Sequence, residues 1–84
     1  MPSSFDFSVG PVAAGNPVTV TVDSAPCETV TVTFTVDGQP AGSGTLDPPD
    51  SIDFNCPTGT QGKAWKVVVS CPGGDSASKG GIVN

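Results

Sequence analysis

The longest strictly alternating run in the chain covers residues 30–36, where Val30, Val32, Phe34 and Val36 alternate with threonines. Successive side chains of a β-strand point to opposite faces, so this run predicts a strand with one apolar face and one hydroxyl-bearing face. An apolar strand face must be covered by a second layer of structure. The run therefore restricts the chain to folds in which a sheet is packed against another layer.

Shorter runs of the same kind, separated by Gly, Pro, Asp and Ser, predict further strands. Together with 30–36, the expected strands cover residues 5–9, 18–22, 41–46, 52–56, 65–71 and 77–83. β-Branched Val and Thr dominate these segments and Leu occurs once in the chain, so we expect no helix. Seven short strands in 84 residues predict a single all-β domain over 1–84, an antiparallel β-sandwich of immunoglobulin-like type. An open meander or a small barrel is the alternative.

Glycine and proline positions refine this expectation. Asp37-Gly38 favours a tight hairpin after the 30–36 strand. Pro40 cannot donate to a strand ladder, so it predicts that the returning strand is short and lies at a sheet edge. The pair Gly80 and Gly81 predicts a bulge in the last strand.

The charge balance limits the classes of partner. The formal net charge is −5, and no arginine is present. The chain therefore lacks a basic face for phosphates or anionic lipid, and we expect no nucleic-acid or membrane partner. Its first residues, Met1, Pro2, Ser3 and Ser4, also lack the basic and apolar regions of a signal peptide.

Residues suited to catalysis are scarce. Without His, Arg or Tyr, the chain cannot build a Ser-His-Asp or Cys-His arrangement, because a lone Ser or Cys lacks the base that would activate it. We therefore expect a protein that is not an enzyme and that uses no cofactor.

One acidic segment has the residue types of a metal site. Asp47, Asp50 and Asp53 lie close together in sequence and could offer oxygen ligands to Ca²⁺, although their spacing matches no EF-hand pattern. A solvated acidic turn is the preferred interpretation, so no metal site is expected.

The three cysteines, Cys27, Cys56 and Cys71, lack the spacing and the histidines of a closed zinc site. If strands alternate in direction, Cys27 before the third strand and Cys71 at the end of the sixth lie at the same end of the sandwich, and Cys56 lies at the other. Cys27 with Cys71 is therefore the expected disulfide if their Cα atoms come within about 7 Å. Three buried, reduced thiols are the alternative.

Several segments together resemble a known group of modules. The run 30–36 with Asp37-Gly38, the pair Ile52 and Phe54, and the run Ala64-Trp65-Lys66-Val67-Val68-Val69 are similar to bacterial and archaeal immunoglobulin-like domains of the CARDB type. The chain departs from that pattern in having Trp65 where Tyr is commoner, in lacking Pro-Gly before that strand, and in its cysteines. The resemblance implies a surface-displayed spacer or binding module, and related small sandwiches decorate the heads and tails of tailed phages.

These considerations favour two non-enzymatic functions. The first is a virion assembly component, a phage head or tail decoration protein that docks on capsid or other assembly subunits, with Met1, Pro2, Ser3 and Ser4 as expected contacts in a complete chain. The alternative is an extracellular adhesion or spacer domain from a bacterial or archaeal surface protein. Self-association through edge strands is a further possibility.

Overall fold

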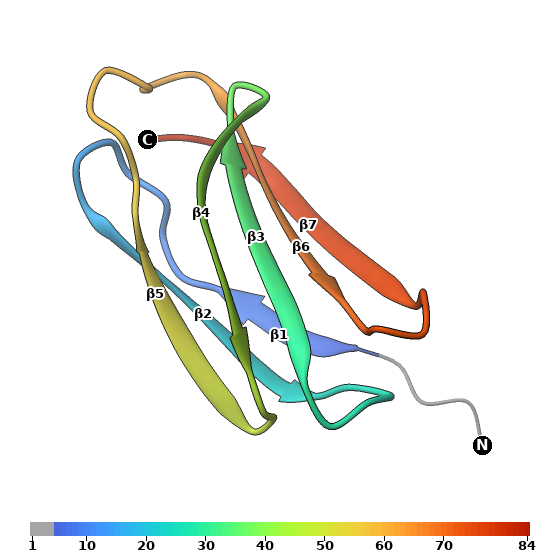
Figure 1. Ribbon diagram of the computed structural model, residues 1–84. Helices are drawn as coiled ribbons and strands as arrows, with labels where there is room; N and C mark the ends of the chain where they lie inside the picture. The colour runs from blue at the N-terminus through green and yellow to red at the C-terminus, as the bar shows by residue number, and fades with distance from the viewer. Residues whose placement is uncertain (1–4) are drawn as a thin grey trace.

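The computed structural model describes residues 5–84, which form seven strands in two packed antiparallel sheets (Figure 1). In chain order the strands are β1 (Asp6–Val9), β2 (Pro17–Ser24), β3 (Val30–Val36), β4 (Gln39–Leu46), β5 (Asp50–Asn55), β6 (Ala64–Ser70) and β7 (Ser76–Ile82). The smaller sheet has the order β1-β2-β5 and the larger sheet has the order β4-β3-β6-β7. Residues 5–84 contain no helix, and the predicted all-β sandwich is confirmed.

The two central strands, β2 and β3, set the register of their sheets. Val20 lies opposite Val9 of β1 and Ile52 of β5. Phe34 of β3 lies opposite Gly42 of β4 and Val67 of β6. The apolar positions of neighbouring strands therefore share one face of each sheet.

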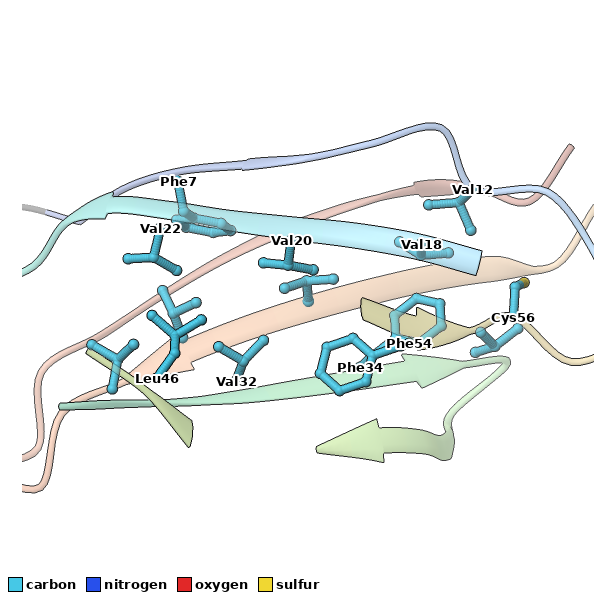
Figure 2. Close-up of a cluster of buried hydrophobic side chains, with 14 of the residues drawn as sticks. Phe7, Val12, Val18, Val20, Val22, Val32, Phe34, Leu46, Phe54 and Cys56 are labelled. Carbon is cyan, nitrogen blue, oxygen red and sulfur yellow. The ribbon is translucent and has the colours of Figure 1, made fainter. Parts of the chain in front are cut away.

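The core lies between these two apolar faces, as Figure 2 shows for side chains of β2 and β3 that point toward each other. Val18, Val20 and Val22 of β2 are completely buried, as are Val32 and Phe34 of β3. The other buried apolar residues are Phe7, Val12, Val30, Val36, Leu46, Phe54, Cys56, Val67, Val69, Cys71 and Val83. Among residues 5–84 no polar or charged residue is buried, so the interior is apolar throughout.

β4 lies at a sheet edge as Pro40 predicts, but the expectation that it is short is wrong. The strand runs for eight residues, from Gln39 to Leu46. It accommodates Pro40 through a shift of register between Phe34 and Thr35 of the neighbouring β3. A local irregularity thus replaces early termination, because an edge strand needs donors on one side only.

β4 and β5 belong to different sheets, and glycines bring them together along one side of the sandwich (Figure 1). A Cβ atom at Gly42 would lie 2.5 Å from Cδ1 of the Phe54 ring. That ring stacks on Phe34 with the centroids 5.8 Å apart. The missing side chain at Gly42 therefore gives Phe54 its place in the core.

The bulge predicted at Gly80 and Gly81 is wrong, since the β6–β7 pairing continues without a register shift through both residues. A Cβ at Gly80 would lie 2.9 Å from the Trp65 carbonyl oxygen, and a Cβ at Gly81 would lie 3.0 Å from the Trp65 Nε1. Both glycines therefore make room for Trp65 on the neighbouring strand.

We predict that Gly42→Ala lowers the free energy of unfolding by about 1 kcal/mol or more, because the new methyl group overpacks the stacked Phe54 ring. For a domain of this size the loss corresponds to a fall in Tm of about 4–8 °C per kcal/mol. The matched control is Gly73→Ala, where a Cβ meets no atom within 4 Å. Thermal unfolding checks the difference, and equal Tm values for the two variants would contradict this packing.

Candidate functional site

The structure joins Cys27 and Cys71 in a disulfide with the Cα atoms 6.0 Å apart. Cys27 lies in the β2–β3 loop and Cys71 directly follows β6, so the bond ties two neighbouring strands of the larger sheet together at one end. Cys27 precedes β3, so the inward and outward alternation of that strand does not fix the direction in which the Cys27 side chain points. The pair is the one that the strand directions favour, and reduced thiols at these two positions are not seen.

Cys56 is the free cysteine among residues 5–84 and is buried. Its backbone N–H donates to the Asn16 carbonyl at 3.0 Å, which places it beside the β1–β2 loop at the opposite end of the sandwich (Figure 1). The Cys56 thiol is therefore both buried and at the other end of the sandwich from the Cys27–Cys71 disulfide.

We predict that reduction of the Cys27–Cys71 bond lowers the free energy of unfolding by about 4 kcal/mol, from the loop entropy released by a cross-link between residues 44 positions apart. Urea titration with and without reductant measures the loss. Thiol counting on chain unfolded without reductant should give one free thiol, since Cys56 is buried in the native chain, and Cys56→Ala should remove it without changing the response to reductant. Three reactive thiols in the untreated, unfolded protein would contradict the bond.

The three candidate calcium ligands do not converge. Asp47 Oδ1 accepts a hydrogen bond from Thr29 Oγ1 at 2.6 Å, and Asp53 Oδ1 accepts one from Thr19 Oγ1 at 2.7 Å. Asp50 Oδ1 accepts from the backbone N–H of the next residue at 2.8 Å. Asp50 and Asp53 stand three positions apart on β5 and so point to opposite faces of the sheet. Within residues 5–84, no cluster of three or more acidic, Cys or His side chains could hold a metal ion.

The expected contacts at Met1, Pro2, Ser3 and Ser4 lie outside the described residues. The expectation that these residues contact a partner stays a prediction.

The outward faces of the two sheets differ in charge. On the smaller sheet, the outward positions include Asp6, Asp23 and Asp53. On the larger sheet, most outward positions carry hydroxyl or small side chains, two carry the apolar Val68 and Ile82, and one is charged, Lys66. We call this second surface the hydroxyl face; it consists of Thr31, Thr33, Thr35, Pro40, Ser43, Thr45, Ala64, Lys66, Val68, Ser70, Ser76, Ser78, Gly80 and Ile82. The four strands that build it contain no carboxylate, although the chain has eight.

One end of the hydroxyl face is hollowed. An open groove of about 340 Å³ lies over β3, β6 and β7. Its lining residues are Thr35, Gly38, Ala64, Trp65, Lys66, Ser78, Lys79 and Gly80. Gly80 lies opposite Lys66 in the β6–β7 ladder, so the groove opens where β7 lacks a side chain. Ile82, which is 61% exposed, follows two positions later on the same face.

Trp65 alternates with the buried Val67 and Val69 and packs against the core, but it is only half-buried. Its ring lies against Gly81 of the adjacent strand, where a Cβ would come within 3.1 Å of three ring atoms. Trp65 thus covers one end of the core. It is also one of the residues that line the groove.

Lys79 points toward the other sheet from the edge strand β7. Its Nζ lies 5.0 Å from the centroid of the Phe7 ring of β1. Lys79 lies opposite the buried Val67, which is an inward position in the alternation. An inward-pointing lysine on an edge strand opposes pairing with the edge of another sheet, because the added strand would bury the ammonium group away from water.

We predict that Lys79→Val makes the chain dimerise through β7, since the variant has an edge strand without an inward charge. Sedimentation velocity over a range of concentrations measures the association. Lys63→Val, which removes an exposed lysine just before β6, is the matched control and should sediment like the unmodified chain. Identical sedimentation of all three proteins would show that Lys79 does not protect this edge.

Comparison with protein-family models, curated proteins and solved structures gives no match to this chain. In the described part of the chain, no helix is long and apolar enough to cross a membrane.

Proposed function

We propose that this protein is a non-enzymatic structural module that docks on a larger protein assembly. The proposed assembly is a virion, on whose head or tail the chain is a decoration protein. The observation that carries this proposal is the hydroxyl face, a four-stranded surface without a carboxylate on a chain of net charge −5.

A protein surface that docks on another must lose water from its centre. Charged residues are depleted in the cores of protein interfaces, because desolvating an unpaired carboxylate is costly. The acidic side chains of this protein lie on the smaller sheet and in the loops, among them Asp6, Asp53 and Asp75. The hydroxyl face is therefore the side that loses least when it is covered by a partner.

The absence of histidine from the sequence supports a role without catalysis, and the hydrogen bonds of the acidic residues point the same way. Asp47, Asp50 and Asp53 each bond a separate partner. A glycosidase-like pair needs two carboxyl groups that face one shared substrate. Docking requires no such group.

The disulfide supports a location at a surface exposed to oxidising conditions. Disulfides persist on virion and cell surfaces and are rare in reducing compartments. The Cys27–Cys71 bond is therefore compatible with a mature virion, and it favours equally the second candidate, an extracellular adhesion or spacer domain.

We predict that the natural protein co-sediments with virus particles released from the organism that encodes it. The measurement is gradient centrifugation followed by detection with an antibody against the chain, with gold labelling of the same fractions under the electron microscope. Recovery in the cell-envelope fraction would instead support the adhesion or spacer function. Recovery only as a free, unattached protein would contradict docking in both settings.

A further inference from the structure

We propose that the groove at the end of the hydroxyl face is a binding site for an acidic side chain, presented by an extended segment of the partner protein. This inference rests on the proposed docking function and assigns the part of the face that selects the partner.

The residues that line the groove carry positive charge only. Lys66 and Lys79 both line it, and no lining residue is a carboxylate. The Lys79 ammonium group lies over the Phe7 ring at the sheet edge, so its charge faces the core side of β7. Lys66 is exposed on the outward side and supplies the positive charge of the groove. A site with one cation and no anion is complementary to one carboxylate.

Hydroxyl groups beside Lys66 add polar partners. Thr35 lies directly opposite Lys66 in the β3–β6 ladder, and its Oγ1 donates a hydrogen bond to the Lys66 carbonyl oxygen at 3.4 Å. Ser78 occupies the next outward position of β7 before Gly80. A carboxylate accepts hydrogen bonds from hydroxyl and ammonium donors alike, so the Ser78 hydroxyl and the Lys66 ammonium group form a donor pair for one such group. The Thr35 hydroxyl is engaged with the Lys66 carbonyl oxygen and helps to fix the β6 backbone beside them.

The shape of the groove explains why the site accepts a side chain. Gly80 lines the groove and cannot be replaced without a conflict, because a Cβ there would lie 2.9 Å from the Trp65 carbonyl oxygen. The volume of about 340 Å³ falls at the small end of the range for ligand sites, about 300–1,000 Å³. A groove of this size accepts one or two side chains and is small for a large cofactor.

Apolar contacts flank the polar donors. Ala64 lines the groove, and its partner in the ladder is Ile82, the one large apolar residue among those described that is mostly exposed. These two residues provide apolar surface for the neighbours of the acidic residue in an extended segment. Asp37 is the carboxylate next in sequence to a lining residue, since it precedes Gly38 in the hairpin turn. Asp37 itself does not line the groove.

The test uses a capped peptide, acetyl-Ala-Glu-Ala-amide, titrated into the full ¹⁵N-labelled chain and followed by NMR. We expect saturable shifts of the amide signals of Thr35, Lys66, Ser78 and Gly80, with affinity in the millimolar range. The neutral acetyl-Ala-Gln-Ala-amide should give no saturable shifts there. Shifts that are absent, or spread over the surface without preference for the groove, would overturn the proposal.

Matched variants separate a specific site from general attraction of an acidic peptide to any lysine. Lys66→Glu should weaken peptide binding at least about tenfold, since an attraction becomes a repulsion. Lys63→Glu has the same change of charge at an exposed lysine outside the groove and should bind as the unmodified chain does. Equal weakening by both variants would overturn the assignment to the groove. A spectrum with unchanged dispersion establishes that each variant is folded.

The failures of the two proposals are distinguishable. A chain that co-sediments with particles but ignores the acidic peptide keeps the docking function and loses the groove. A chain that binds the peptide through Lys66 but is found on no assembly keeps the groove and loses the docking function. If Lys66→Glu abolishes concentration-dependent self-association of the chain, the occupant is a second copy, and the assignment to a different protein is overturned.

Discussion

The structure depends on one constraint, the alternation of apolar and polar side chains on β2 and β3, which the apolar inward positions of β6 continue. These strands contribute completely buried residues, including Val20, Phe34 and Val67, which meet between the two sheets. A shift of register by one residue would place the threonines of β3 in the core and its valines in water. The same alternation that builds the interior therefore also builds the hydroxyl face on the other side of the larger sheet. The core and the proposed docking surface are two consequences of one sequence pattern.

Other contacts close the sides and ends of the sandwich. Gly42 lets the ring of Phe54 reach Phe34, which closes the side between β4 and β5. The Cys27–Cys71 bond ties β3 to β6 at one end, and Trp65 covers the core at the other. On the remaining side, Lys79 reaches from β7 toward Phe7. The hydroxyl face thus belongs to a sheet that is held at both ends, so the docking that we propose would not require the strands to be ordered first.

The sequence predicts the strands and their pairing well where alternation is strict, and poorly where tertiary contacts decide. The 30–36 strand has the predicted bounds because every inward position is apolar. β4 is longer than Pro40 predicts because a register shift absorbs the proline, and Gly80-Gly81 makes room for Trp65 instead of a bulge. Val12 lies outside any alternating run, yet it is buried where its carbonyl accepts a bond from the Asn84 N–H.

The candidate site was harder to predict than the fold. The hydroxyl face combines outward residues of four strands, and the groove needs Lys66, Ser78 and Gly80 to be neighbours across the ladder. One signal was present in the sequence: residues 30–36, 39–46, 64–70 and 76–82 contain no carboxylate, whereas the acidic residues occupy the rest of the chain. The weak calcium candidate at the acidic turn gains no support from the structure, because Asp50 and Asp53 point to opposite faces of the sheet.

The central claim is that the hydroxyl face is covered when the protein is in its natural assembly. Acetylation of lysine amines, quantified by mass spectrometry for the free chain and for the assembled chain, tests it most directly. The account predicts that Lys66 reacts freely in the isolated protein and is strongly protected in the assembly, while Lys63 reacts similarly in both. Equal reactivity of Lys66 in the two states would contradict it.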